Sequence, residues 1–148
     1  MSDPYLYSVS NAVATFSIND APWNLMSVAY IDRLEEQLPD VLGDDRIRAI
    51  VFTGEGEANF SAGMNLRQIP EGIRRAGSPE AFFGQRHRVL DMIENGGTPA
   101  IATLFGFCLG AVSRGDGWLR SRRLGGQALP TPGARLQTTI RARRIRSR

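Results

Sequence analysis

The chain has 148 residues, of which 42% are hydrophobic and 22% are charged, a composition ordinary for one globular domain with a buried core. No apolar run approaches the roughly 20 residues that a membrane-spanning helix needs, and the N-terminus lacks the pattern of a signal peptide. A single cysteine, Cys108, excludes an intrachain disulfide. We therefore expect a cytoplasmic protein.

The net charge of +3 is unevenly distributed along the chain. Residues 1–110 carry 8 Arg and 14 acidic side chains, a net charge of −6, whereas residues 111–148 carry 10 Arg and one acid, a net charge of +9. Such an asymmetry is typical of a separate tail. We expect a folded domain in residues 1–110 and a basic, poorly ordered tail in residues 111–148.

The first predicted elements are a strand and a helix. Residues 12–18 alternate between apolar and mixed positions, which predicts a strand with Ala12, Ala14, Phe16 and Ile18 on its buried face. Residues 19–22 then break the strand. Ser27 is a suitable N-cap for a helix that runs to Gly43. Its apolar positions follow at helical spacing, and they are Val28, Ile31, Leu34, Leu38, Val41 and Leu42. Pro39 should kink this helix or end it early.

A second strand is expected in residues 47–53, whose continuous apolar run is typical of a strand covered on both faces. The glycine-rich residues 54–56 turn the chain. Residues 60–66 then predict a turn that opens a short helix, which should end before Pro70.

A longer helix and a third strand follow. Ser78, Pro79 and Glu80 form a strong helix start, and residues 95–97 end the helix. The expected buried stripe consists of Phe82, Phe83, Val89, Leu90 and Ile93. Residues 100–105 predict another strand. Strands that alternate with helices indicate an α/β fold with parallel pairing. Residues 111–148 show no sustained hydrophobic period and are expected to be disordered.

Three ordered segments resemble the crotonase family, that of enoyl-CoA hydratases and isomerases. Residues 22–27 read PWNLMS and are similar to the family's loop that packs on coenzyme A. Residues 47–66 read IRAIVFTGEGEANFSAGMNL and resemble its strand, glycine turn and F-S-A-G-x-[DN]-L motif. Residues 100–110 read AIATLFGFCLG and resemble the opening of its G-x-x-L-G-G-G-x-E segment. The resemblance implies a partial crotonase-like core with the spiral ββα fold of the ClpP and crotonase proteins.

The resemblance also implies chemistry on acyl-CoA thioesters. Family reactions pass through a thioester enolate, whose oxygen is stabilised by two backbone N–H groups. By resemblance these are the N–H groups of Met64, which follows the turn at Gly63, and of Ala111, which follows Gly110. Asn65 stands where the family more often has Asp and can still cap the helix. The substrate- and CoA-binding residues implied by the family are Trp23, Asn24, Leu25, Ala62, Gly63, Met64, Asn65, Leu66 and Gly110.

The catalytic carboxylates of the hydratases are not found at their expected positions. Arg114 stands where the first glutamate belongs, and the Pro-Glu motif that supplies the second is missing. An arginine cannot serve as a general base because its pKa stays above about 12. We therefore expect little or no hydratase activity. The family resemblance ends after Gly110, and the composition becomes rich in Arg at the same position. This coincidence suggests that the reading frame is lost there.

Several alternatives remain open. The segment of residues 60–66 could be an ordinary strand–turn–helix junction, and Trp23 and Leu25 could simply belong to the core. His87 is expected to be solvated, with no metal-ligand spacing around it, and Cys108 to be buried packing. The protein could be a non-catalytic acyl-CoA-binding or hetero-oligomeric family member. The basic tail could instead bind nucleic acid unspecifically, although this is the less favoured interpretation.

No permanently bound cofactor is expected beyond the coenzyme A of the substrate, and the family implies a trimer-based homo-oligomer.

Overall fold

The computed structural model describes residues 3–109 and 136–138. One sheet has the strand order β1-β2-β3-β4-β5. Its strands are β1 Tyr5–Ser10, β2 Val13–Ile18, β3 Ala49–Gly54, β4 Ala100–Leu104 and β5 Leu136–Thr138. Strands β2, β3 and β4 are parallel, while β1 and β5 pair antiparallel at the two edges. The expected α/β fold with parallel pairing is confirmed. Strand β5 falls within the predicted tail, and the rest of residues 110–148 lies outside the described residues.

Strand β1 was not predicted from the sequence. It forms a hairpin with β2 in which Ser10 pairs with Val13, leaving Asn11 and Ala12 as the two loop residues. Both have positive φ, 50° and 62°, as two-residue hairpin loops require. Ala12 therefore lies in the turn and not on the buried face of a strand, which corrects the sequence prediction.

Strand β3 is central in the sheet but is not equally covered on its two faces. Ile50 and Phe52 are buried, whereas Ala49, Val51 and Thr53 are only partly buried. The prediction of a strand covered on both faces is therefore wrong for the described part of the chain. The buried face is the one that packs into the hydrophobic core with Phe16 and Tyr30.

Helix α1 (Val28–Gly43) begins and ends where the sequence predicts. The Ser27 hydroxyl accepts a hydrogen bond of 3.0 Å from the Tyr30 N–H, as an N-cap does. Pro39 lies inside the helix and does not end it. Its ring is on the exposed face, while Leu38 and Val41 beside it are buried in the core. Packing of this apolar face outweighs the local cost of a proline inside a helix.

Pro70 does not end a helix as predicted; it lies at the start of one. The 3₁₀ helix η1 (Leu66–Gln68) leads directly into helix α2 (Ile69–Ala76), with Pro70 in its first turn. A proline suits this place because the first N–H groups of a helix have no partner inside the helix.

Helix α3 (Pro79–Asn95) starts as predicted, with Ser78 as its N-cap. Its buried face differs from the prediction. Phe82 and Val89 are buried, but Phe83 is 42% exposed and Arg86 is buried instead. Arg86 takes that place because it lies one helical turn beyond Phe82, on the same face.

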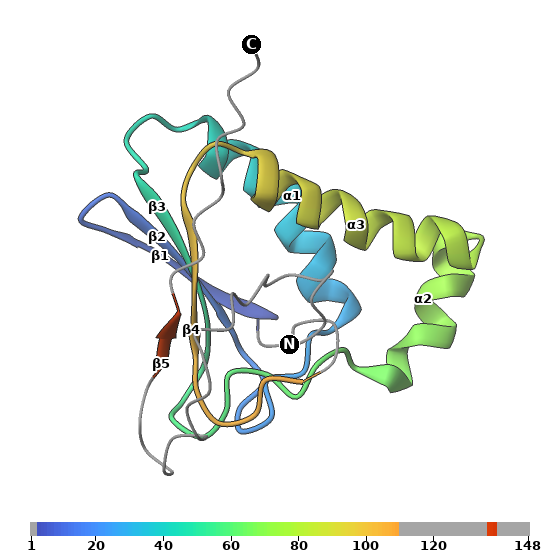
Figure 1. The fold of residues 1–148 in the computed structure, drawn as a ribbon. Coiled ribbons are helices and arrows are strands. Elements are labelled where there is room, and N and C mark those ends of the chain that lie inside the picture. The colour runs from blue at the N-terminus through green and yellow to red at the C-terminus, as the bar shows by residue number, and fades with distance from the viewer. Residues whose placement is uncertain (1–2, 110–135, 139–148) are drawn as a thin grey trace, which may run out of the picture.

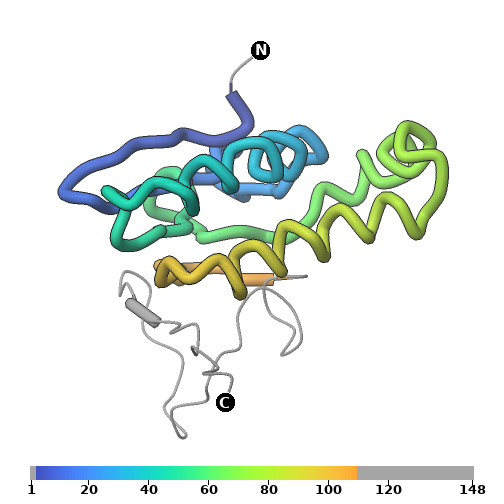
Figure 2. Tube along the Cα trace, turned by 90° about the horizontal axis from the view of Figure 1, so that it is seen from above, coloured from blue at the N-terminus to red at the C-terminus, as the bar shows by residue number. Residues whose placement is uncertain are grey.

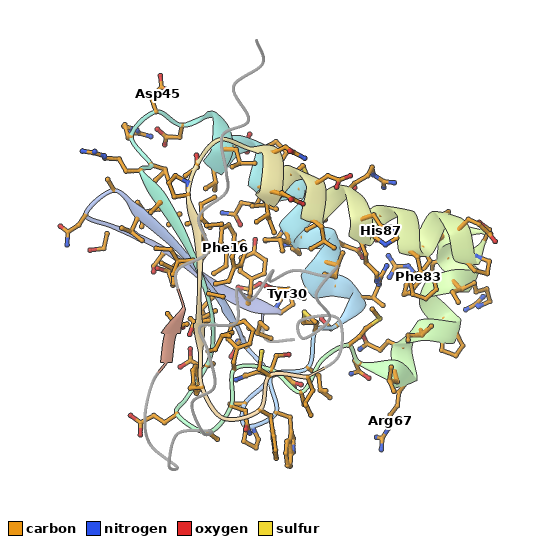
Figure 3. All side chains as sticks on the ribbon, viewed as in Figure 1. Phe16, Tyr30, Asp45, Arg67, Phe83 and His87 are labelled. Carbon is orange, nitrogen blue, oxygen red and sulfur yellow. The ribbon has the colours of Figure 1, made fainter. Side chains whose placement is uncertain are left out.

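The three helices lie on one side of the sheet (Figure 1). Helices α1 and α3 contact each other, and α2 stands at the end of α3 away from the sheet (Figures 1 and 2). Phe16 from β2 and Tyr30 from α1 meet in the core between these layers (Figure 3). Among the described helices, none combines the length and apolar character needed to cross a membrane.

Candidate functional site

The loops that follow β2, β3 and β4 lie side by side. The carboxyl ends of parallel strands meet at one edge of a sheet, so these loops start close together. Met26 and Met64 form a parallel bridge between the first and second loops, and Ser61 and Cys108 form one between the second and third. The Phe60 N–H also donates to the Phe105 carbonyl oxygen at 2.7 Å. The three segments that carry the family resemblance are thus brought together.

Asn24 holds the first loop against the second. It is fully buried and has a positive φ of 49°. Its side-chain amide donates to the carbonyl oxygens of Glu55 and Asn59 at 2.9 and 2.7 Å. Its side-chain oxygen accepts from the Asp20 N–H at 3.3 Å. The Asn24 side chain therefore points into the protein and positions the loop; it does not face solvent as a substrate contact would.

Asn59 continues this network to the third loop. Its side-chain amide donates to the Pro22 carbonyl oxygen at 2.9 Å, and its side-chain oxygen accepts from the Phe107 N–H at 2.8 Å. Sequence reasoning did not single out Asn59. Residue type alone does not distinguish a buried asparagine from a solvated one. The one available signal was its position between the glycine turn and the apolar Phe60.

Ser61 is the second residue that sequence reasoning missed. Its buried hydroxyl donates to the Asn24 carbonyl oxygen at 2.6 Å and accepts from the Gly63 N–H at 3.0 Å. Buried polar groups cost free energy unless they are hydrogen-bonded, and here both are satisfied. Ser61 therefore links the first loop to the turn that carries Met64.

Two glycines allow the loops to approach each other closely. A Cβ atom on Gly54 would lie 2.2 Å from the Phe60 carbonyl oxygen, and one on Gly106 would lie 1.9 Å from the Ala58 carbonyl oxygen. Both contacts are with backbone, which cannot move aside as the end of a side chain can. The closeness of the loops thus depends on these glycines.

The Met64 N–H is the available donor in this segment. The N–H groups of its neighbours in the turn are all bonded, that of Ala62 to the Trp23 carbonyl oxygen, that of Gly63 to Ser61, and that of Asn65 to the Met26 carbonyl oxygen. Within the described residues, the Met64 N–H has no hydrogen-bond partner. Because the Gly63 carbonyl and the Asn65 N–H both point to Met26, the Met64 N–H lies on the other side of the backbone.

The local geometry around Met64 partly corrects the prediction. Gly63 has a positive φ of 100°, so it does provide the tight turn. Asn65, however, makes no side-chain capping bond, and the helical segment that follows is the three-residue η1. The Met64 N–H is thus fixed by the bridge to Met26 and not by a place inside a helix N-terminus.

The three loops around the Met64 turn carry apolar side chains that are exposed or half-buried. Trp23 is 52% exposed, and its ring stacks on that of Phe107 with centroids 6.0 Å apart. Leu25 is half-buried, and Leu66 is exposed. Trp23 is therefore not a core residue. Gly110 and Ala111, which carry the predicted second donor, lie outside the described residues.

The side chains of His87 and Cys108 supply no reactive group to the site, although the backbone of Cys108 pairs with Ser61. His87 is exposed on α3, as expected (Figure 3). Cys108 is half-buried against the core, and burial raises the pKa of its thiol, which makes it a poor nucleophile. Within the described residues, no cluster of three His, Cys, Asp or Glu side chains could hold a metal ion.

Three parallel central strands with the loops after them packed together, and the F-S-A-G turn in the second of these loops, form the arrangement of the crotonase class. Residues 14–112 match the family model described as enoyl-CoA hydratase/isomerase. This match covers more than half of the chain, which therefore belongs to the enoyl-CoA hydratase/isomerase family.

Curated relatives match a similar length of the chain. It is 27% identical over 104 residues to a probable enoyl-CoA hydratase from Bacillus subtilis, covering 70% of this chain and 39% of that protein. It is 29% identical over 100 residues to a peroxisomal bifunctional enzyme from Pongo abelii, covering 68% of this chain and 13% of that protein. The chain thus spans less than half the length of these relatives.

Solved structures show the same fold. An enoyl-CoA hydratase/isomerase family protein from Silicibacter pomeroyi is 26% identical with a TM-score of 0.60, over 70% of this chain and 44% of that one. A carnitinyl-CoA dehydratase from Mycobacterium thermoresistibile is 22% identical with a TM-score of 0.64, over 74% of this chain and 33% of that one. The second likeness is one of fold alone.

Proposed function

We propose that the described part of the chain binds an acyl-CoA thioester and that the Met64 N–H donates a hydrogen bond to the thioester carbonyl oxygen. The observation that carries this proposal is the Met64 N–H, which has no partner among residues 3–109 and 136–138. Its position is fixed because Gly63 and Asn65, on either side of it, are both hydrogen-bonded to Met26. A donor held in place before the substrate arrives costs no reorganisation when negative charge develops on the oxygen. The exposed Trp23–Phe107 pair offers an apolar surface for the cofactor part of the substrate, and the Trp23 carbonyl oxygen accepts from the N–H of Ala62 in the same turn as Met64.

We infer that this site polarises the thioester without hydrating it. The position of the first catalytic glutamate is taken by Arg114, which lies outside the described residues. General acid–base steps contribute about 10²- to 10⁴-fold each, so losing both carboxylates removes most of a hydratase's rate. The Ala111 N–H remains the proposed second donor.

A test of the site compares Met64→Pro with Met64→Ala. Proline removes the backbone N–H, whereas alanine removes only the side chain. The readout is the ultraviolet absorbance of the acetoacetyl-CoA enolate on mixing with protein. We expect the wild type and Met64→Ala to stabilise the enolate and Met64→Pro to lose about 3 kcal/mol of that stabilisation, the range seen when one such donor is removed.

Two results would contradict the proposal. Equal enolate signals from Met64→Pro and Met64→Ala, with both variants folded by circular dichroism, would show that the N–H is not the donor. Hydration of crotonyl-CoA well above the uncatalysed rate would show that another residue replaces the missing glutamates.

We also propose a boundary after Gly110. The residues before it belong to a family domain that is cytoplasmic and assembles in trimers. The basic segment after it is translated from a different reading frame. The family match ends at residue 112, and ten of the 18 Arg residues follow residue 110. Sequencing the gene through this codon and downstream tests the proposal. A neighbouring frame that encodes Gly-Gly-x-Glu and then Pro-Glu supports it, whereas its absence in every frame overturns it.

A further inference from the structure

Arg86 is a buried arginine on the face of α3 that meets α2. It is 6% exposed, although arginine is almost never buried unless it is paired. Its guanidinium carbon lies 3.3 Å from the centroid of the Phe82 ring. That ring in turn packs against Gly72 of α2, where a Cβ atom would lie 2.3 Å from it. Arg86 is therefore enclosed between the two helices.

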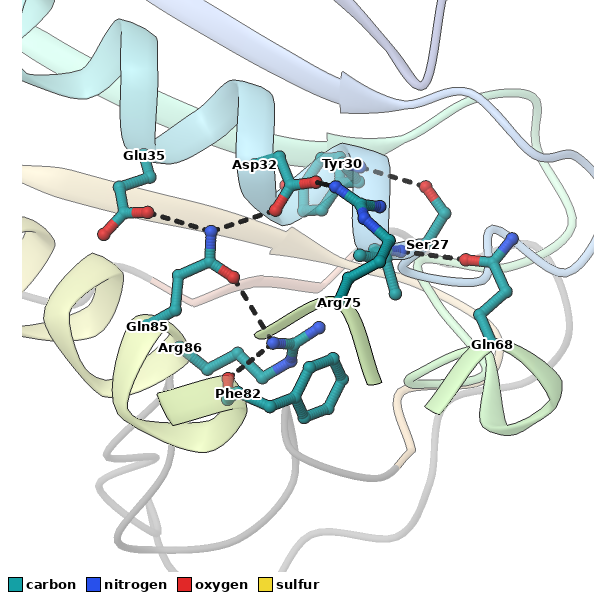
Figure 4. A network of polar contacts seen from close by, with 10 residues as sticks. Ser27, Tyr30, Asp32, Glu35, Gln68, Arg75, Phe82, Gln85 and Arg86 are labelled. Carbon is teal, nitrogen blue, oxygen red and sulfur yellow. Dashed lines mark hydrogen bonds and ion pairs between the residues drawn. The ribbon is translucent and has the colours of Figure 1, made fainter. Parts of the chain in front are cut away.

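Among the described residues, the Arg86 guanidinium makes hydrogen bonds through one nitrogen, Nη1. Its Nη1 donates to the Phe82 carbonyl oxygen at 2.6 Å and to the Gln85 side-chain oxygen at 3.5 Å (Figure 4). Its Nε and Nη2 atoms are buried and have no hydrogen-bond partner in the described part of the chain. These two atoms form a single edge of the planar group, and this edge binds a carboxylate with two parallel hydrogen bonds.

The two carboxylates that Gln85 contacts, those of Asp32 and Glu35, already have partners. Gln85 donates through its amide nitrogen to Asp32 at 2.9 Å and to Glu35 at 2.8 Å, which joins the two acids of α1 (Figure 4). Asp32 also pairs with Arg75 at 3.3 Å, and Glu35 pairs with Arg88 at 2.9 Å.

The charged side chains around Gln85 carry an excess positive charge. Asp32 and Glu35 supply two negative charges, while Arg75, Arg88 and Arg86 supply three positive ones. Arg75 and Arg88 are exposed and paired, so the excess resides on buried Arg86. Burial lowers the pKa of Arg86, which Asp32 opposes only in part. A buried charge without a partner is unfavourable, and a buried arginine with a free edge indicates that a carboxylate completes it.

Helix α2 covers Arg86 but is weakly held. Gly72 is its only buried residue. Its one ion pair to α1 in the described structure, between Arg75 and Asp32, is largely exposed. The helix ends at Gly77 in the left-handed conformation with open space around it. Segments with so few buried contacts open locally at low cost, so α2 can move to admit a ligand.

The same segment connects Arg86 to Met64. Helix η1 begins two residues after Met64, and the Gln68 side chain in η1 accepts a hydrogen bond of 2.9 Å from the Val28 N–H of α1. Along η1 and the first turn of α2 the backbone rises on the order of 12 Å before it reaches Gly72. Helices η1 and α2 thus lead from the turn at Met64 to the Phe82 ring, on which Arg86 lies.

We propose that the Nε–Nη2 edge of Arg86 binds a carboxylate at the far end of the acyl group, so that the substrate is the CoA thioester of a dicarboxylic acid. This inference rests on the proposed function of Met64. It adds the substrate class, which the contacts around Met64 do not define.

The test is a calorimetric comparison of decanedioyl-CoA with decanoyl-CoA, which have equal chain length and differ in the terminal carboxylate. A ten-carbon chain is chosen because its extended length is comparable to the rise from η1 to Gly72. We expect the wild type to bind decanedioyl-CoA about 10- to 100-fold more tightly, the range for hydrogen bonds to a charged group. Arg86→Met should abolish this preference and leave the affinity for decanoyl-CoA unchanged. Arg88→Met, which makes the same change in net charge on the same helix, should keep the preference. Arg86→Met is expected to fold, because an apolar side chain replaces an unpaired buried charge.

Equal binding of the two thioesters by the wild type would overturn the inference, and so would a preference that survives Arg86→Met. A changed oligomeric state of Arg86→Met in light scattering, without changed discrimination, would assign the edge to an acid of another copy and also overturn it. If neither thioester binds, the proposed function of Met64 fails, and the acyl group is not the source of the carboxylate. Free glutarate then decides the Arg86 site separately. Thermal stabilisation of the wild type but not of Arg86→Met supports a carboxylate site, and equal behaviour excludes one.

Discussion

The hydroxyl of Ser61 donates a hydrogen bond of 2.6 Å to the backbone carbonyl oxygen of Asn24, across 37 residues of sequence. The same hydroxyl accepts the N–H of Gly63, the residue before Met64. A single buried side chain therefore joins the loop after β2 to the turn that carries the proposed donor. This relationship explains why a small hydroxyl residue is needed between Phe60 and Ala62.

Ser61→Ala should lower the free energy of unfolding by about 1–3 kcal/mol, because it leaves two buried backbone groups without partners. Urea denaturation measures this loss. Ser8→Ala, at an exposed position of β1, is the matched control and should stay within about 0.5 kcal/mol of the wild type. Equal stability of the two variants would show that the bonds of Ser61 are dispensable.

Substitutions of Asn24 should separate its hydrogen bonds from its backbone conformation. Asn24→Gly removes the side-chain bonds but tolerates the φ of 49°, and should cost about 2–3 kcal/mol of stability. Asn24→Ala should cost about 1–2 kcal/mol more, because alanine disfavours the left-handed region. Chemical denaturation of both variants tests this order, and a more stable alanine variant would contradict it.

Gly106→Ala should be among the most damaging single changes in the loops. A Cβ atom there meets backbone at 1.9 Å in addition to the cost of a positive φ. Gly97→Ala is the matched control, since Gly97 also has a positive φ but nothing within 4 Å of the added atom. We expect about 1–2 kcal/mol for Gly97→Ala and a larger loss for Gly106→Ala, measured by thermal unfolding. Similar losses would show that the loops shift to accommodate the methyl group.

The stability of the turn after α1 should depend on pH through Asp44. Hydrogen bonds from Arg46 lower the pKa of the Asp44 carboxyl from 3.8 to about 2. A lowered pKa in the folded state stabilises the protein above the unfolded value, and this contribution is lost as the pH falls from about 4 to about 2. Asp44→Asn should therefore be less stable than the wild type at neutral pH but not near pH 2. Urea midpoints across this range test the expectation, with Asp45→Asn as the control, and a constant difference would refute it.

Much of the fold could be predicted from local pattern. The cap at Ser27 and the start at Ser78–Pro79 are set by side chains next to the helix ends, so both helices begin where expected. Three strands were located, although β3 and β4 have slightly different bounds. The hairpin of β1 was missed because its loop, Asn11–Ala12, lacks the glycine that usually indicates such a turn.

The sequence predictions were wrong where tertiary packing determines which side chain is buried or where a helix ends. Phe83 and Arg86 both lie on α3, and hydrophobicity favours Phe83 for the core. The contact of Phe82 with Gly72 places Arg86 on the enclosed face instead. Pro39 was expected to kink its helix or to end it early, but packing of the buried face of α1 continues the helix past this residue. A short helix was expected to end before Pro70, but Pro70 lies in the first turn of α2.

The sequence by itself determined the family, because F-S-A-G-M-N-L and its two companion segments depend on residue types that the chemistry requires, such as the glycine before the donor. Only the tertiary structure decided which groups are free. It paired Asn24, Asn59 and Ser61 across three loops, and left the Met64 N–H and one edge of Arg86 without partners among the described residues. Whether a polar group is satisfied depends on atoms distant in the chain, and local sequence does not contain their positions.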